Sequence, residues 1–543
     1  MAQISGNLEG LKGAHKRVLE KLARRQIQPG AAIQPALAIE MVEAAVTIGR
    51  QVGIVGDRLG AVEEVIVGSD FAMALPEAHE RRRPTGRLSG RRFIHVHLRG
   101  ELIDIEDVLL LTRLRYDFLG VLIPDPTGKN PLIQLAYPRC SLGSQAPYEK
   151  VGPVPLSALT LNVNTLVSAI EEELRRRQLE LIPTEGSRRQ RGILVHVSVP
   201  GDGLDAETCM EELGKLAWSA GVGVVDRIVQ RRKAVDNASF IGKGKLIDII
   251  VRSLVGDADL VIFDHDLNPR QVRTLTDLTG LKVIDRTQLI LDIFAQRAQT
   301  NDGKLQVELA QMKYLMPRLV ERDDALSRLT GQIGTRGPGE TKLEIGRRRV
   351  RERIARLTRQ VEQIAKNRRV RRGRREKRGT QLVALVGYTN AGKSTILNRL
   401  AGASEPAEDR FFSTLDPRSR QVRLPSGRTI VLTDTVGLIR QLPPSLLAAF
   451  RPTFEEIVGA SLILVILDAG SDQLPSHIRM IDKTLTDLDI DAIPRLTILN
   501  KIDIAPPGRI EQLRREYDGV PVSAVEGTGL GDLLGVIDSR LGP

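Results

Sequence analysis

The sequence is poor in cysteine. Only two cysteines, Cys140 and Cys209, occur among 543 residues, and they lie far apart. Two distant thiols exclude a disulfide framework and a zinc site built from cysteines, and they are typical of a reducing compartment. We therefore expect a cytoplasmic protein.

The sequence also lacks targeting and membrane signals. Its first residues, MAQISGNLEG, do not contain the basic stretch followed by an apolar stretch that marks a secretory signal. The longest apolar runs, such as 462–467, are far shorter than the roughly 20 residues that a spanning helix needs. We expect no membrane span.

The net positive charge of the chain comes from one segment. The net charge is +12, yet residues 347–378 alone hold 14 Arg and 2 Lys against 3 Glu, a net of +13. Such a concentration is the expected footprint of a polyanion, either nucleic acid or an anionic membrane surface. A solvated helix face is the alternative interpretation, and the density of arginines favours RNA.

The chain is long enough for three or four domains at roughly 150 residues each. Alternating apolar and amphipathic segments predict a multidomain α/β protein. We expect an extra N-terminal α/β region of unknown role at 1–185, a small α/β domain at 192–300, a helical hairpin at 303–378 and a C-terminal P-loop domain at 380–543.

Within the first region, His95 and His97 alternate on an expected strand. They could form a metal pair, but no third ligand is evident in the sequence, so ordinary strand histidines are the preferred interpretation. The next region contains Gly242, Lys243, Gly244 and Lys245 before an apolar helix. This pattern could cradle a phosphate, and a tight turn with two solvated lysines is preferred over it.

The third region predicts two helices that pair as an antiparallel coiled coil around a glycine-rich tip at 331–342. Apolar residues recur at steps of three and four in each helix. Pro317 should kink or break the first helix near its end, and Gly373 should mark the break before the last domain. The apolar seam comprises Leu305, Leu309, Met312, Met316 and Leu319, opposite Val350, Ile354, Leu357, Val361 and Ile364.

The last region carries the motifs of a guanine-nucleotide site in order. An apolar strand runs into GYTNAGKS, residues 387–394, and then into a helix, which is the context that identifies a P-loop. Lys393 should bridge the β- and γ-phosphates, and Ser394 should ligate Mg²⁺. Thr414, with Ser413 as a competitor, should close on Mg²⁺ and the γ-phosphate, and Gly437 should offer the γ-phosphate a backbone N–H.

The motif NKID, residues 500–503, selects the base. The carboxylate of Asp503 can accept two hydrogen bonds from guanine, whereas adenine offers no such pair of donors. Lys393, Thr414 and Gly437 are the expected catalytic residues, and Ser394 and Thr414 the expected metal ligands. The expected nucleotide contacts are Gly387, Tyr388, Thr389, Asn390, Ala391, Gly392, Lys393, Ser394, Phe412, Ser413, Thr414, Leu415, Asp416, Asp434, Thr435, Val436, Gly437, Asn500, Lys501, Ile502, Asp503, Ser523, Ala524 and Val525.

Two residues bear on the rate of hydrolysis. Leu438 follows the DTVG motif, where many small GTPases place a glutamine that orients water. We therefore expect slow unaided hydrolysis that needs a partner or another group. Asn390 occupies the fourth P-loop position, which in some related GTPases coordinates K⁺, so K⁺ is a possible activator beside Mg²⁺.

These motifs, together with IGKGK (241–245) and IGTRGPGETKLE (333–344), resemble the HflX family of translation-associated GTPases over about 192–540. The resemblance implies a cytoplasmic GTPase that binds the 50S ribosomal subunit and ribosomal RNA through the hairpin, and that dissociates or rescues stalled 70S ribosomes. It would act as a monomer. The alternatives are an assembly factor that acts on immature 50S particles and a nucleotide-gated RNA-binding protein with negligible turnover.

Overall fold

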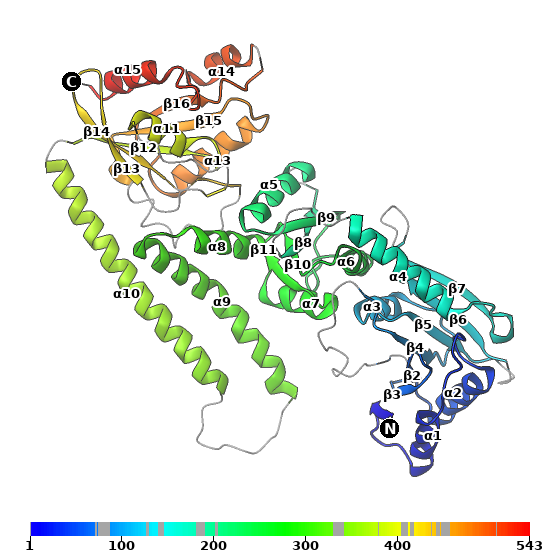
Figure 1. Ribbon diagram of the computed structural model, residues 1–543. Helices are drawn as coiled ribbons and strands as arrows, with labels where there is room; N and C mark the ends of the chain where they lie inside the picture. The colour runs from blue at the N-terminus through cyan, green and yellow to red at the C-terminus, as the bar shows by residue number, and fades with distance from the viewer. Residues whose placement is uncertain are drawn as a thin grey trace. The chain divides into compact units, whose positions relative to one another are not determined.

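The computed structural model describes residues 2–70, 73, 87–125, 130–139, 146–180, 190–200, 205–329, 342–377, 380–402, 411–412, 418–435, 437–440, 446, 457–506 and 508–542 (Figure 1). The chain forms two compact units. The first comprises Met1–Gly214 with Gly221–Asp285, and the second comprises Lys215–Ala220 with Arg286–Pro543. Among the described helices, none is long and apolar enough to cross a membrane.

The first unit begins with a mixed seven-stranded sheet in the order β1-β3-β2-β4-β5-β6-β7. Only β1–β3 and β4–β5 pair in parallel. Every residue of the inner strand β5 is buried, as expected for a strand covered on both faces. The strands are β1 Gln3–Gly6, β2 Val52–Asp57, β3 Val62–Val67, β4 Arg91–Val96, β5 Phe118–Ile123, β6 Leu132–Pro138 and β7 Tyr148–Pro155, with helices α1 Gly13–Ala23, α2 Pro35–Ile48, α3 Ile105–Arg113 and α4 Val163–Glu180 and the short turn Leu156–Ala158.

A four-stranded sheet in the order β11-β10-β8-β9 completes the first unit. All of its strand pairs are parallel, which confirms the predicted parallel α/β fold. Strand β9 was not predicted from the sequence, because this edge strand buries few side chains and lacks a clear apolar pattern. The elements are β8 Arg191–Ser198, α5 Ala206–Ser219, β9 Gly223–Arg231, α6 Lys243–Gly256, β10 Leu260–Phe263, α7 Pro269–Thr279 and β11 Lys282–Asp285.

The two sheets of the first unit share one continuous apolar core that runs from Leu19 to Val283. Helix α6 packs against both α3 and α4, so the boundary expected between 185 and 192 falls inside this compact unit. The domain limits drawn from the sequence stay a prediction.

The second unit contains α8 Arg286–Arg297 and the predicted helical hairpin, α9 Asn301–Leu329 and α10 Lys342–Lys377. Leu309, Leu357 and Val361 are buried between the two long helices, as the seam predicts. The helix does not break at Pro317, because α9 continues through it to Leu329, and a kink there stays a prediction. The expected break at Gly373 was also wrong: a glycine costs a helix only about 1 kcal/mol, and its arginine and lysine neighbours favour helix. The tip at 331–341 lies outside the described residues.

The rest of the second unit is a six-stranded sheet in the order β13-β14-β12-β15-β16-β17. All its pairs are parallel except β13–β14. The carboxyl ends of β12, β14, β15 and β16 therefore meet at one edge, where ligands of such sheets bind. The elements are β12 Leu382–Gly387, α11 Lys393–Leu400, β13 Arg418–Arg423, β14 Thr429–Asp434, the short turn Ile457–Gly459, β15 Leu462–Asp468, α13 Leu474–Asp487, β16 Arg495–Asn500, α14 Arg509–Tyr517, β17 Val520–Pro521 and α15 Leu530–Arg540.

Candidate nucleotide-binding site

The loop between β12 and α11 is shaped by close backbone approaches. A Cβ on Gly387 would lie 2.4 Å from the carbonyl oxygen of Ile466, and one on Gly392 would lie 2.1 Å from Nδ2 of Asn500. Gly392, the residue that immediately precedes α11, also has a φ of +94°, a conformation that suits glycine. The loop therefore leaves its backbone N–H groups at the start of a helix, where an anion binds.

Lys393 is the buried charge of this loop. Its side chain is only 6% exposed, and Nζ donates to the carbonyl oxygens of Gly387 at 3.1 Å and Tyr388 at 2.9 Å. Burial lowers the pKa of Lys393 to about 8, against a smaller opposing effect of the Asp434 carboxylate. The structure thus holds a costly ammonium at the place where phosphates would neutralise it.

Two oxygen-bearing side chains, those of Ser394 and Asp434, meet beside this lysine. The hydroxyl of Ser394 donates to Oδ2 of Asp434 over 2.6 Å. This hydrogen bond joins the start of α11 to the end of β14. Hydroxyl and carboxylate oxygens are the donors that Mg²⁺ prefers. A Cβ on Gly437 would lie 3.1 Å from Nζ of Lys393, which places that backbone next to the same point, while Thr435 bonds back to Leu385 at 2.6 Å.

The NKID residues join two loops. Asn500 donates from Nδ2 to the carbonyl oxygen of Ala391 at 2.8 Å and accepts from the N–H of Ala524 at 3.1 Å. Its buried amide therefore fixes the P-loop against the loop that follows β17. Ser523 donates to Oδ1 of Asp503 at 2.6 Å, which orients an exposed carboxylate.

The remaining expected contacts surround the same edge of the sheet. The N–H of Thr389 donates to Leu438 O at 2.8 Å, and the N–H of Ile502 to Val522 O at 3.4 Å. Asn390 is exposed with a φ of +63°, and Val525 is exposed as well. Phe412 is buried against Phe294, with ring centroids 4.6 Å apart. The expected contacts Ser413, Thr414, Leu415, Asp416 and Val436 lie outside the described residues.

Three supporting contacts were not predicted from the sequence. Asp468, at the end of β15, pairs with Nζ of Lys501 at 2.8 Å. The alignment of Asp468 with Asn500 on parallel strands could have indicated it. Arg399 donates to Ala524 O at 3.1 Å and also to Val525 O, and the ring of Tyr388 stacks on His477 at 3.9 Å. The last two join distant segments and leave no local signal.

Known families match the chain in three consecutive stretches. They are described as GTP-binding GTPase N-terminal (residues 207–295), GTP-binding GTPase Middle Region (297–375) and 50S ribosome-binding GTPase (382–501). Among solved structures, a GTP-binding protein from Sulfolobus solfataricus in complex with GDP is 23% identical, with 65% of this chain and 99% of that chain covered and a TM-score of 0.36.

Curated relatives agree with these families. The chain is 46% identical over 357 residues to GTPase HflX of Caldanaerobacter subterraneus subsp. tengcongensis. The aligned stretch covers 65% of this chain and 81% of that protein. It is 42% identical over 356 residues to GTPase HflX of Escherichia coli strain K12, with 65% and 83% covered. The motifs, their geometry and these relatives together show that the chain belongs to the HflX family of GTPases.

Proposed function

We propose that this GTPase binds Mg²⁺·GTP at the edge formed by β12, β14 and β16. The observation that carries the proposal is the convergence of Lys393, the Ser394–Asp434 pair and Asn500 on one P-loop. The motif that contains Asn500 also supplies the oriented carboxylate of Asp503. Lys393 would neutralise the β- and γ-phosphates, and the backbone of Gly437 would contact the γ-phosphate.

Ser394 would hold Mg²⁺ directly, with Thr414 as the second ligand, and Asp434 would act through water. When bound, Mg²⁺ neutralises charge that develops on the phosphate oxygens. The chain's own contribution is to position the phosphates with its backbone and to exclude water with the buried core below the loop. Asn500 holds the P-loop and the loop that follows β17 in fixed positions relative to each other.

The burial of Leu438 supports the expectation that hydrolysis without a partner is slow. Its side chain is 2% exposed, and its backbone bonds to Gly387 and Thr389 on the P-loop strand. A buried leucine offers no group that orients an attacking water, so we propose that a partner assembles the hydrolytic geometry.

We propose K⁺ as an activator through Asn390 and expect faster hydrolysis in KCl than in NaCl at equal ionic strength. Asn390 presents an exposed amide from a left-handed backbone beside the phosphate loop, and a cation there would stabilise charge in the transition state. The variant Asn390→Gly keeps access to the left-handed conformation and removes the amide. Rates that are equal in the two salts, or a K⁺ effect that survives in Asn390→Gly, would contradict the proposal.

We further propose that the hairpin binds ribosomal RNA of the 50S subunit and that GTP binding and hydrolysis drive dissociation of stalled 70S ribosomes. The hairpin supports this role by its charge: residues 347–378 carry a net +13, and Arg349, Arg351, Arg356 and Arg359 are exposed on α10. Most of the electrostatic attraction of the chain for phosphate therefore lies on one helix.

The test is GTP turnover with and without purified 50S subunits, alongside sucrose-gradient profiles of 70S ribosomes. We expect stimulation by 50S subunits and nucleotide-dependent conversion of 70S ribosomes into subunits. Binding to immature particles without splitting would instead support an assembly factor. Absence of both stimulation and co-sedimentation would contradict a ribosomal role.

A pair of matched variants isolates the hairpin. Arg356→Gln/Arg359→Gln removes two exposed charges from α10, whereas Arg514→Gln/Arg515→Gln removes two exposed charges from α14. The hairpin variant should bind 50S subunits about tenfold more weakly and reduce the salt dependence of binding by about two phosphate contacts. Equal losses in both variants would argue against the hairpin as the RNA-binding element.

A further inference from the structure

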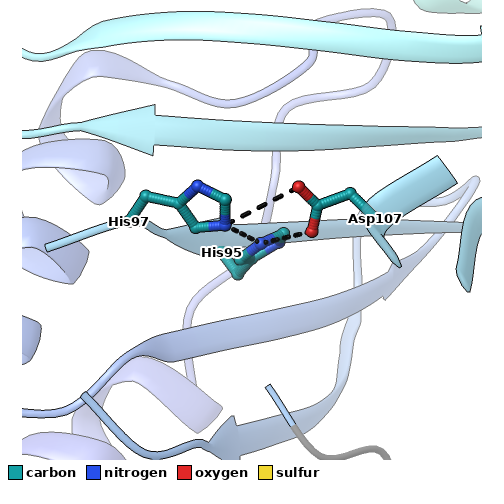
Figure 2. A group of neighbouring side chains, drawn as sticks. All are labelled: His95, His97 and Asp107. Atoms are coloured by element: carbon teal, nitrogen blue, oxygen red, sulfur yellow. Dashed lines mark hydrogen bonds and ion pairs between the residues drawn. The ribbon is translucent and has the colours of Figure 1, made fainter. Parts of the chain in front are cut away.

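A cluster of polar side chains lies buried in the first unit, away from the nucleotide site. His95 lies on β4, His97 directly follows that strand, and Asp107 lies in the first turn of α3. Their exposures are 0%, 7% and 8%. Figure 2 shows the two imidazole rings and the carboxylate directed at one another. Polar groups so far from water need compensating partners, because burial without them is costly.

The separations between the three side chains resemble those of metal ligands. His95 Nε2 lies 2.8 Å from His97 Nε2 and 3.2 Å from Asp107 Oδ1, and His97 Nε2 lies 3.7 Å from Asp107 Oδ2. Two ligands about 2.0–2.1 Å from a tetrahedral zinc ion are separated by about 3.3 Å. The observed values bracket that separation, so a small shift of the side chains would admit one ion between all three.

Hydrogen bonding on the outer side of the cluster fixes the ligand atoms. His97 Nδ1 lies 3.0 Å from the carbonyl oxygen of Glu101, which can only accept. His97 must therefore carry its proton on Nδ1, and its Nε2 keeps a lone pair. A backbone carbonyl behind a histidine is the arrangement that orients metal-bound imidazoles.

Hydrogen bonds among the three side chains leave some of their acceptors without a donor. His97 Nε2 and the Asp107 carboxylate are both acceptors, and in neutral His95 a single Nε2–H must serve both. His95 Nδ1 is then an acceptor, and within the described chain it has no hydrogen-bond partner. With its proton on Nδ1 instead, His95 turns the lone pair of Nε2 inward. Two imidazole lone pairs and the negative carboxylate then surround a point that a divalent cation would satisfy better than one shared proton.

The position of Asp107 is set independently of any ligand. Asp104 caps α3 by accepting from the N–H groups of Glu106 and Asp107, and Asp107 Oδ2 accepts from the N–H of Asp104 at 3.0 Å. This capping box leaves Oδ1 directed at His95. On the other side, the ring of Phe93 stacks on that of His95 with centroids 4.9 Å apart. The ligand atoms are therefore held before an ion arrives, which favours binding.

We propose that His95, His97 and Asp107 bind a divalent transition-metal ion, with Zn²⁺ the expected ion and a fourth coordination position for water or another ligand. Two imidazoles and one carboxylate are a set that Zn²⁺ accepts. The site ties β4 to α3 and is separate from the Mg²⁺ position at Ser394. A second group, His196, Cys209 and Asp264, also lies close together in the same unit, and the test distinguishes the two.

The experiment uses the full-length protein, stripped with a chelator, incubated with Zn²⁺, desalted and analysed for zinc by mass spectrometry. The wild-type protein should retain about one equivalent per chain and unfold at a higher temperature with Zn²⁺ than without it. His97→Gln and Asp107→Asn should lose most of the bound zinc and the Zn²⁺-dependent shift, while the control His15→Gln retains both. Circular dichroism and a cooperative thermal unfolding transition of each metal-free variant show that the first unit is folded.

Substitution with Co²⁺ provides a measurement that needs no variant. Cobalt bound by nitrogen and oxygen ligands should show visible d–d bands without the near-ultraviolet charge-transfer band of a thiolate. A wild-type protein that retains no zinc would overturn the proposal. Retention by His97→Gln and Asp107→Asn with loss in Cys209→Ala would overturn it too, because the metal would then lie at His196, Cys209 and Asp264.

Discussion

Lys393→Met is expected to abolish GTP hydrolysis and, at neutral pH, to stabilise the ligand-free protein. Loss of the ammonium beside the phosphates should lower kcat by about 100- to 1000-fold or more, as for other charges that stabilise a transition state. Methionine has a similar length but no charge, so it fills the same buried space without the cost of holding an ammonium there. Function and stability therefore make opposite demands on this position.

The size and pH dependence of the stabilisation follow from the pKa. Burial lowers the pKa of Lys393 from 10.5 to about 8, which corresponds to about 3 kcal/mol. Below pH 8 the lysine is protonated in both states, so the folded protein carries the whole cost. Between pH 8 and 10.5 the unfolded chain binds more protons, and stability of the wild-type protein rises with pH.

Calorimetry of both proteins without nucleotide would measure this effect. At about pH 7.5 the variant should be more stable by about 1–3 kcal/mol, since the lost hydrogen bonds to Gly387 and Tyr388 offset part of the gain. The difference should shrink at about pH 9.5, as the wild-type lysine loses its proton. A variant that is less stable than the wild type at neutral pH, or a difference that does not change with pH, would contradict this account.

Local patterns were enough to predict the fold around the P-loop. The strand that precedes the P-loop is apolar throughout, and the helix starts at Lys393, so the loop conformation follows from residues that are adjacent in sequence. The meeting of Ser394 with Asp434 required one further step, the alignment of β12 with β14 in a parallel sheet. This alignment could be inferred from the sequence because the order of the motifs matches a known family.

The position of Asp107 beside His95 and His97 could not be predicted from the sequence. His95 and His97 were interpreted as ordinary strand residues because no third ligand was evident. Asp107 reads as an N-terminal helix residue in the sequence, and its second role appears only once α3 folds back over the strand. No break occurs at Pro317 or Gly373, because each lies inside a long helix whose other residues favour helix, and one unfavourable residue does not end such a helix.

Asp503→Asn is expected to change the base that the protein binds. The carboxylate should accept from the N1–H and the exocyclic amine of guanine, and each such charged hydrogen bond contributes about 1.5–3 kcal/mol. In the variant the amide N–H would face the exocyclic amine, donor against donor. Affinity for GTP should fall by about 100- to 1000-fold or more, measured by equilibrium binding of a fluorescent nucleotide.

Xanthosine triphosphate serves as the matched ligand for this variant, because xanthine carries a carbonyl oxygen where guanine carries the amine. Ser523 donates to Oδ1 of Asp503, so it should keep an asparagine oxygen in that position and leave the amide N–H to the base. Xanthosine triphosphate should therefore bind the variant better than GTP does, with hydrolysis restored. If the variant instead bound GTP as the wild type does, or if neither nucleotide bound while the protein remained folded, Asp503 would not be the residue that selects the base.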